Sequence, residues 1–541
     1  MPGPYVLAID AGSSSVRAML VAADGDVSGS FSRPMAPKFP RPGWVEFDPE
    51  HLWQIVVECI AGALGAAGSD GSDVASVGVT SHRETVMVWD RATGAPVHDA
   101  VMWLSKQTDD IVRGWSEQGL DPLIRERTGL RNDSYFSAGK LAWLLEHVPG
   151  VRRDAEAGRL AAGTPDTWLL WKLTGGTAHR TDPSCASRTA LLNLERRTWD
   201  TELCDVLGIP LSLMAEIVPS DAEFGRVDAG LLPSRPPVNG VLADQQAGLY
   251  GQACTTPGDA KNTFGTAGVL VVNAGDRAQP VPGTTSSVAW QLAGGTAYEY
   301  EGVVFHAGQT LHWLRDRMGI ADAEALSGDI AESVADTGGV YFVPGFAGLC
   351  DPHWDRDARA AIVGITLETD KAHIVRAALE AMAYQTLDNV DALAAGGVSI
   401  PMLRVDGGAA RNDFLCQFQA DVLGVPVERP RGLERTALGV AQVAGAGAGL
   451  WDAAGGPAAT RRIDRVFEPL MGSAWRDQLV GGWRDAVATT RAHPPARAAA
   501  ARAAAPDAPA GALPEQSAAP AAPRTPSTDE KRKHDEQLTL R

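Results

Sequence analysis

Residues 5–27 read YVLAIDAGSSSVRAMLVAADGDV, and this stretch decides the fold. An apolar run ends at Asp10, a glycine- and serine-rich turn follows, and a second apolar run begins near Val16, which predicts strand, turn and strand. A carboxylate at a strand end can hold Mg²⁺, and the N–H groups and hydroxyls of such a turn, with the charge of Arg17, suit phosphate oxygens. An ordinary β-hairpin turn is the alternative, and this motif alone does not decide between them.

Beyond this stretch, helical patterns alternate with short apolar strands. HLWQIVVECIAGAL (51–64) precedes VASVGVTS (74–81), and this alternation favours α/β layers. The opening pattern recurs loosely in KNTFGTAGVLVVNAG (261–275), where a polar turn containing glycine again leads into a valine-rich strand. The recurrence indicates a second domain built like the first.

Composition narrows the class of protein. The 541 residues include 66 acidic and 48 basic side chains, a formal net charge of −18, which disfavours binding to nucleic acid or anionic lipid. The six cysteines stand singly, which argues against a disulfide framework and a structural zinc site. No signal peptide or long apolar run is visible, so we expect a cytoplasmic protein without membrane insertion. The alanine- and proline-rich residues 493–541 are predicted to be a disordered tail.

Two further turns and one isolated aspartate add to the opening motif. Asp244 stands between an apolar strand and a helix start in VLADQQAGLYGQ (241–252), where a carboxylate could accept the proton of an attacking hydroxyl in phosphoryl transfer. An aspartate before a helix is also simply an N-cap, so both interpretations stay open. Thr266 would lie in a second phosphate turn, and the loop 406–408 would let a nucleotide approach closely. AGAGAGL (444–450) is interpreted as part of a packed helix and not as a dinucleotide turn.

With these pieces in order, the chain resembles the FGGY carbohydrate kinases and, within that family, the kinases that act on glycerol. The resemblance runs from about residue 5 to residue 483 and leaves the tail uncovered. Besides the turns already quoted, the matched blocks are PGWVEFDPEHLW (42–53), SHRETVMVWDRATG (81–94), YFSAGKLAWLLEH (135–147), GTPDTWLLWKLTGG (163–176), HWDRDARAAIVGIT (353–366) and DGGAARNDFLCQFQADVLGVPVERP (406–430).

The resemblance implies an α/β fold of two actin/hexokinase-like domains, each with a ribonuclease-H-like core, and a cleft between them. The domains are expected at residues 1–250, with the polyol site and the catalytic aspartate, and at 251–492, with the second phosphate turn and the adenosine site. The implied reaction transfers the γ-phosphate of ATP, with Mg²⁺, to a small polyol, with glycerol first. A homodimer or homotetramer is also implied.

The same resemblance assigns roles to individual residues. Asp10 would help to hold Mg²⁺, and Asp244 would be the general base. The residues expected to face the nucleotide are Ser13, Ser14 and Arg17 at the phosphates, Thr266 and Gly308 along the β/γ-phosphate path, and Gly408 and Asn412 beside the adenosine. The residues expected to hold the polyol are Arg83, Glu84, Trp103, Tyr135, Asp244 and Gln245. A charged donor beside a charged acceptor suits hydroxyls, which both donate and accept; for Arg83-Glu84 the alternative is a surface ion pair.

One departure from the family pattern bears on the substrate. Val269 falls where the family's glycerol kinases have an aromatic residue against the glycerol carbons, and the smaller side chain would leave space for a longer polyol. A kinase for a four- or five-carbon polyol or a ketose is therefore the first alternative. An actin- or chaperone-like ATPase switch and a catalytically dead homologue are more distant alternatives, and the hydroxyl-binding set and the retained Asp10, Asp244 and Thr266 speak against them.

Overall fold

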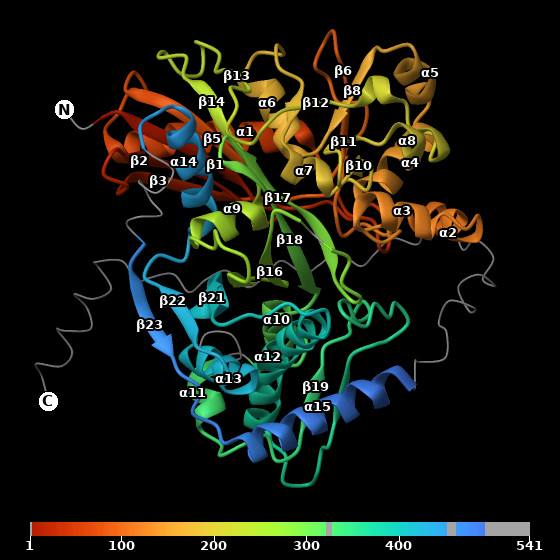
Figure 1. The fold of residues 1–541 in the computed structure, drawn as a ribbon, viewed down its shortest axis with the longest axis vertical. Coiled ribbons are helices and arrows are strands. Elements are labelled where there is room, and N and C mark those ends of the chain that lie inside the picture. The colour runs from red at the N-terminus through yellow and green to blue at the C-terminus, as the bar shows by residue number, and fades with distance from the viewer. Residues whose placement is uncertain (1–2, 278, 321–326, 452–460, 493–541) are drawn as a thin grey trace, which may run out of the picture. The chain divides into compact units, whose positions relative to one another are not determined.

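A computed structural model describes residues 3–277, 279–320, 327–451 and 461–492 (Figure 1). These residues form two large mixed β-sheets covered by helices, so the predicted α/β class is confirmed. The predicted tail at 493–541 lies outside the described residues. The domain boundaries expected near residues 250 and 492 stay predictions.

The first sheet has six strands in the order β13-β14-β5-β1-β2-β3. β1, β2 and β3 form an antiparallel meander, while β5 lies parallel to β1 and β14 parallel to β5. The turn between β1 and β2 is the predicted glycine- and serine-rich turn. The strands are β1 (Tyr5–Ala11), β2 (Ser15–Ala22), β3 (Val27–Pro34), β5 (Val74–Ser81), β13 (Gly225–Arg226) and β14 (Pro237–Ala243).

The second sheet has seven strands in the order β17-β18-β16-β15-β21-β22-β23 and repeats this pattern. Three antiparallel strands, β15, β16 and β18, are again followed by two parallel neighbours, β21 and β22. The loose recurrence seen in the sequence therefore reflects a second sheet with the same strand arrangement. The strands are β15 (Ala260–Phe264), β16 (Gly268–Gly275), β17 (Thr285–Leu292), β18 (Gly295–Val304), β21 (Leu403–Asp406), β22 (Val427–Pro430) and β23 (Ile463–Phe467).

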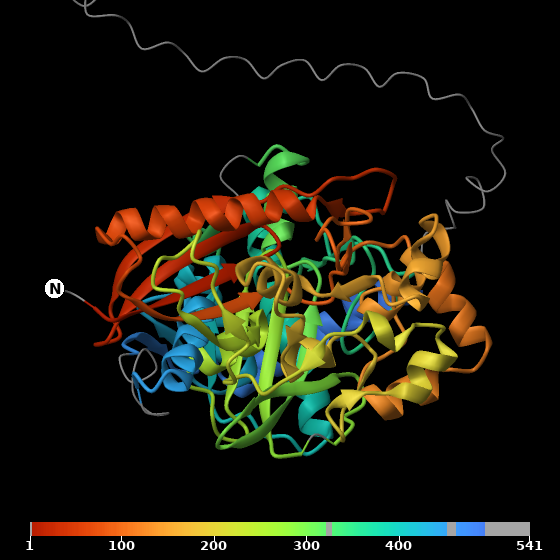
Figure 2. The same cartoon turned by 90° about the horizontal axis from the view of Figure 1, so that it is seen from above.

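Long helices cover the sheets and begin and end where local sequence dictates. Asp48 caps the N-terminus of α1 (Pro49–Ala67) by accepting from the N–H of Glu50, and Gly68 ends it in the left-handed region at φ 67°. Figure 2 shows α1 running along the strands β2 and β3, against which it packs. The helices near the second sheet are α10 (Gly308–Asp316), α11 (Ser327–Glu332), α12 (Lys371–Ala395), α13 (Asp413–Leu423) and α15 (Ser473–Ala492).

A set of short helices and ribbons lies in the chain mostly between β5 and β13, and much of it packs around an apolar cluster of its own. This part carries Trp103 and Tyr135. The helices are α2 (Asp109–Glu117), α3 (Asp121–Thr128), α4 (Ser137–His147), α5 (Val151–Glu156), α6 (Pro165–Leu173), α7 (Pro183–Ser187) and α8 (Thr201–Val206). The paired ribbons are β4 (Glu46–Phe47) with β7 (Ala100–Val101), β6 (Met87–Asp90) with β8 (Leu160–Gly163), β9 (Arg180–Thr181) with β12 (Glu216–Ile217), β10 (Leu192–Asn193) with β11 (Thr198–Trp199), and, near the second sheet, β19 (Tyr341–Val343) with β20 (Ala361–Val363).

Helix α14 (Arg435–Gly447), late in the chain, packs on β14, β5 and β1 of the first sheet and on α9 (Asp244–Gly251) (Figure 1). Two strand glycines allow this approach, because a Cβ on Gly78 would lie 2.7 Å from the carbonyl oxygen of Val440 and one on Gly240 2.6 Å from the amide nitrogen of Ala444. Residues 444–447 are the last turn of α14, so the interpretation of this small-residue stretch as part of a packed helix is confirmed.

Candidate active site

One cavity of about 390 Å³, called the polyol cavity below after the substrate that the resemblance implies, brings together residues predicted separately from the sequence. Its lining comes from the ends of β1, β5 and β14 in the first sheet and from β15, β16 and β18 in the second. The predicted site residues among its lining are Asp10, Ser13, Ser14, Arg83, Glu84, Trp103, Tyr135, Asp244, Gln245 and Thr266, together with Val269.

Sheet topology explains why residues so far apart in the chain converge. Asp10 lies near the end of β1, Arg83 and Glu84 follow β5, and Asp244 follows β14. These three strands are parallel neighbours, and the carboxyl ends of parallel strands meet at one edge of a sheet, where ligands of α/β proteins commonly bind.

Asp244 is the first residue of α9, and the N-cap position belongs to Ala243. Capping therefore does not explain the aspartate. Its Oδ1 accepts from the N–H of Gln245 at 2.7 Å and lies 3.2 Å from Nε of Arg83. The Asp244 side chain keeps 23 % exposure, so the carboxylate is held in place yet can still meet a ligand.

Arg83 and Glu84 are only 5 % and 2 % exposed, so the alternative of a surface ion pair is wrong. Burial opposes the charge on Arg83, but Glu301, Glu84 and Asp244 hold its pKa well above the ordinary value. Burial raises the pKa of Glu84, and Arg83 and Arg188 act against this rise. The pair thus offers a permanent donor beside an acceptor within the polyol cavity.

Aromatic and amide groups complete the polyol cavity. The Trp103 and Tyr135 rings meet edge to face with centroids 5.6 Å apart, which forms an apolar wall. Nζ of Lys261 donates to Oε1 of Gln245 and, at 2.7 Å, to Oγ1 of Thr263. Lys261 therefore orients the Gln245 amide, a role that the sequence interpretation missed.

The turn between β1 and β2 forms one end of the polyol cavity. Asp10 is half-buried, and this burial together with the neighbouring charge of Asp244 raises its pKa to about 7. A Cβ on Gly12 would lie 3.0 Å from the carbonyl oxygen of Ser15, so a side chain there would crowd the turn. Arg17 is not part of the described cavity lining. Its guanidinium forms an ion pair with Glu434, and Glu434 does line the cavity.

A second cavity of about 850 Å³ holds the other predicted nucleotide residues and shares Gly265 and Thr266 with the polyol cavity. Gly308 donates its N–H to the Gly265 carbonyl at 3.0 Å, and a Cβ on Gly408 would meet open space. Asn412 lines this cavity as well but uses Oδ1 to cap α13 at the N–H of Leu415, 3.0 Å away. The second cavity thus brings together Thr266, Gly308, Gly408 and Asn412. It adjoins the cavity that Asp244 lines at the shared residues Gly265 and Thr266.

Two fully buried charges behind the polyol cavity, Arg188 and Glu301, also escaped the sequence interpretation. Tyr298, Glu299, Tyr300 and Glu301 alternate along β18, a pattern typical of a strand with its acidic face in water. The structure buries both glutamates completely, Glu299 against Gln246 of α9 and Glu301 against Arg83 and Arg188. The alternation along β18 therefore indicates solvent exposure for two glutamates that are in fact buried.

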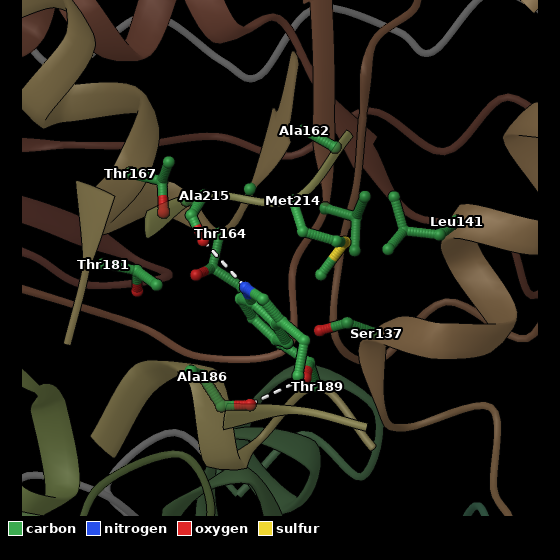
Figure 3. A pocket seen from close by; sticks show the side chains of 13 residues that line it. Ser137, Leu141, Ala162, Thr164, Thr167, Thr181, Ala186, Thr189, Met214 and Ala215 are labelled. Atoms are coloured by element: carbon green, nitrogen blue, oxygen red, sulfur yellow. Dashed lines mark hydrogen bonds between the residues drawn. The ribbon is translucent and has the colours of Figure 1, made fainter. Parts of the chain in front are cut away.

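A closed cavity of about 20 Å³, shown in Figure 3, lies apart from this site. It is lined by Leu141, Met214 and other apolar groups and by five hydroxyls. Each of these hydroxyls already donates a hydrogen bond, as Thr189 does to the Ala186 carbonyl and Ser137 does to the Glu84 carbonyl. A void of this size has room for roughly one water and is a packing defect rather than a ligand site.

Two features are absent from the part of the chain that the structure describes. No helix among the described residues is long and apolar enough to cross a membrane. No group of three or more histidine, cysteine, aspartate or glutamate side chains there is arranged to hold a metal ion by itself.

Comparison with known proteins agrees with this geometry. Residues 5–251 match the N-terminal domain, and residues 260–448 the C-terminal domain, of the FGGY family of carbohydrate kinases. A glycerol kinase of Symbiobacterium thermophilum is 46 % identical over 90 % of this chain and 98 % of its own length. One of Carboxydothermus hydrogenoformans is 44 % identical over 91 % of this chain and 99 % of its own.

Solved structures give the same result. Plasmodium falciparum glycerol kinase with ADP matches with a TM-score of 0.83 and 31 % identity, over 90 % of this chain and 98 % of that one. A xylulose kinase from Lactobacillus acidophilus, at 21 % identity and a TM-score of 0.81, covers 90 % of this chain and 99 % of its own and shares the fold. Matches to both domain families, together with relatives of this identity over nearly the whole described chain, establish that the chain belongs to the FGGY family of carbohydrate kinases.

Proposed function

We propose that this kinase transfers the γ-phosphate of ATP to glycerol and yields glycerol 3-phosphate. The observation that carries the proposal is the polyol cavity, in which Arg83, Glu84 and Tyr135 face the same space as Asp244 beside a phosphate turn. The curated relatives from S. thermophilum and C. hydrogenoformans are glycerol kinases and support the same substrate.

The polyol cavity suits a small triol. Arg83 donates and Glu84 accepts, so one hydroxyl can satisfy both, while Asp244 and the Gln245 amide reach the hydroxyl that reacts. The Trp103–Tyr135 wall excludes water from the carbon chain. A site that bonds every hydroxyl penalises an analogue lacking one, because a buried polar group is then left unpaired.

Asp244 is proposed as the general base. Its carboxylate, fixed by the N–H of Gln245 and by Arg83, would accept the hydroxyl proton as the oxygen attacks phosphorus. Proton transfer of this kind contributes about 10²–10⁴-fold to the rate. Alignment of the two substrates and exclusion of water would supply most of the rest.

ATP would occupy the second cavity, with its adenosine beside Gly408 and Asn412 and its phosphates reaching the shared turn at Thr266. Ser13 and Ser14 would meet the phosphates from the other sheet.

Mg²⁺ fits this arrangement, because the half-buried Asp10 carboxyl, with its pKa raised to about 7 by burial and by Asp244, is a place where a cation would be favourable. One carboxylate with phosphate oxygens and waters is a common donor set for Mg²⁺. When bound, the ion would neutralise charge on the phosphates.

A kinase for a longer polyol or a ketose is the second candidate. Val269 lines the polyol cavity and leaves space beside the substrate carbons that a larger side chain would fill. Under this candidate erythritol, a pentitol or xylulose would outperform glycerol, and Val269→Phe would shift the preference towards glycerol.

The deciding experiment measures ADP release with Mg²⁺-ATP and a panel of glycerol, erythritol, ribitol, xylitol, dihydroxyacetone and xylulose. We expect glycerol to give the highest kcat/KM and Asp244→Asn to lower kcat by about 10²–10⁴-fold. Asp48→Asn is the matched control, because asparagine caps a helix as well as aspartate does. If a longer polyol gives the highest kcat/KM, the assigned substrate changes while the proposed mechanism stays the same. ATP turnover that no polyol stimulates would revive the ATPase switch and reject the kinase proposal.

Assembly and location are proposed on the resemblance alone. We propose a homodimer or homotetramer in the cytoplasm, and light scattering of the purified protein tests the oligomeric part of this proposal.

A further inference from the structure

Four buried charges form a closed ring behind the polyol cavity. Glu301 places Oε2 2.5 Å from Nη1 of Arg83 and Oε1 2.5 Å from Nη2 of Arg188. Arg188 in turn places Nε 2.7 Å from Oε1 of Glu84, and Arg83 Nε lies 3.8 Å from the same oxygen. Positive and negative groups alternate around the ring, and each residue is at most 5 % exposed.

The ring has a front and a back. Arg83 and Glu84 belong to the described lining of the polyol cavity, whereas Arg188 and Glu301 do not. Arg188 follows α7, which contacts β14 of the first sheet and β17 of the second, and Glu301 lies on β18 of the second sheet. The back pair therefore connects the substrate-binding pair to both sheets.

Glu84 needs such support. Its backbone has φ 61°, a left-handed conformation that is uncommon for a residue with a side chain. The hydroxyl of Ser137 donates to the Glu84 carbonyl at 3.1 Å, and Arg188 holds the carboxylate. One contact fixes the main chain and the other fixes the direction of the side chain.

Arg83 needs support of a different kind. Its Nε already lies 3.2 Å from Asp244, the proposed general base, and Nη1 is held on the far side by Glu301. Without Glu301, the most favourable remaining carboxylates for Arg83 are Asp244 and Glu84, because a buried charge without its partner is costly. The guanidinium would then move towards the carboxylate that has to accept the proton.

We infer that Arg188 and Glu301 are positioning residues for the polyol, which act by holding Arg83 and Glu84 in the orientation that meets its hydroxyls. This inference rests on the proposed function, and it adds two residues that touch neither substrate. It requires that loss of either residue raises KM for the polyol and leaves KM for ATP unchanged.

The test compares Glu301→Gln, Arg188→Met and Arg188→Lys with the wild-type enzyme by steady-state kinetics at pH 8. Glu301→Gln and Arg188→Met should raise KM for glycerol by about tenfold or more, lower kcat less, and leave KM for ATP within about twofold. Arg188→Lys should recover part of the loss, since lysine keeps the charge but cannot bond two carboxylates through a rigid fork.

A matched control separates positioning from general damage. Glu380 is 3 % exposed and accepts from Arg376 at 2.8 Å within α12, so Glu380→Gln also breaks a buried ion pair. It should lower the melting temperature, as Glu301→Gln does, and leave KM for glycerol unchanged. If Glu301→Gln does not fold, Arg188→Lys carries the same comparison.

Several outcomes would overturn the inference. KM for glycerol within about twofold of wild type in both Glu301→Gln and Arg188→Lys would do so, as would an equal rise in KM for ATP. If the wild type prefers another polyol, the comparison is made with that polyol and the inference is judged by its KM. A wild-type enzyme that phosphorylates no polyol rejects the proposed function and this inference with it.

Discussion

Lys140 holds the loop that carries Tyr135. Its buried Nζ donates to three successive carbonyl oxygens, those of Ser134 and Tyr135 at 2.7 Å and that of Phe136 at 3.1 Å. An ammonium group has three N–H donors, so each one finds an acceptor. The sequence marks this lysine only as part of a family block, and the structure supplies a physical reason for it.

Lys140→Met should loosen this loop. Three buried carbonyls would lose their donor, which should cost at least about 2 kcal/mol of unfolding free energy. Because Tyr135 lines the polyol cavity, KM for glycerol should rise while KM for ATP stays unchanged. Urea unfolding and steady-state kinetics check both parts, and an unaltered unfolding midpoint would contradict the role given to Lys140.

His179 should make the protein sensitive to acid. Burial, with a smaller effect of Arg91, lowers the pKa of His179 to about 4 from 6.5, while the Ala162 carbonyl acts against this. Between these values the unfolded chain binds a proton that the folded chain does not, so this group's contribution is present above pH 6.5 and is lost as the pH falls to 4. The loss amounts to about 3 kcal/mol.

The measurement compares wild type with His179→Gln by urea unfolding at pH 4.5, 5.5 and 7. The stability of the wild type relative to the variant should fall as the pH falls. A difference that is constant across the three pH values would show that His179 does not titrate in this window.

At the residue scale, the sequence predicted the site residues that stand at strand ends and missed those that stand behind them. Asp10 and Asp244 each follow an apolar run, a pattern that can be recognised in the sequence alone. Arg188 donates to Glu301, which lies 113 residues further along the chain. No local sequence pattern near either residue predicts this contact.

At the scale of elements, the packing of α14 on α9 sets the position of Asp244. A Cβ on Gly439 of α14 would overlap the carbonyl oxygen of Ala247 in α9. Gly439→Ala should therefore cost about 1–3 kcal/mol of stability through overpacking and, because it pushes the helix that begins with Asp244, lower kcat.

Gly481→Ala is the control for this prediction. Gly481 lies within α15, where an added Cβ meets nothing within 4 Å. This change should leave kcat unchanged and raise stability by up to about 1 kcal/mol, since alanine favours a helix over glycine. Thermal unfolding and kcat measured on both variants decide the matter: equal effects of the two changes would refute the packing argument.

Elements were easier to predict than their contacts. The strand ending at Ser81 and the helix α1 follow from apolar periodicity and punctuating residues. The attachment of α14 to the first sheet does not, because its small residues indicate only that something packs closely, not which strand does so.

At the scale of the whole molecule, the described residues that line the two cavities all lie between Asp10 and Thr436. A chain ending at Pro494 should therefore keep kcat/KM for glycerol within about twofold of the full chain, because the match to the second FGGY domain ends at residue 448 and terminal segments of a chain are commonly dispensable. Parallel kinetics on the two chains test this. A loss of tenfold or more would assign the last 47 residues a part in catalysis.

The docking of α14 also bears on how the protein is made. Strands β1, β5 and β14 are complete once the ribosome has passed residue 243, but the apolar face that α14 covers waits for residues 435–447. Val6, Ala8 and Leu242 on that face pack with Val440 and Ala444 only after some 200 further residues have been added. A nascent chain of this kinase therefore carries an uncovered, aggregation-prone surface through more than a third of its synthesis, and a chaperone that binds apolar strands would find it there until α14 leaves the ribosome.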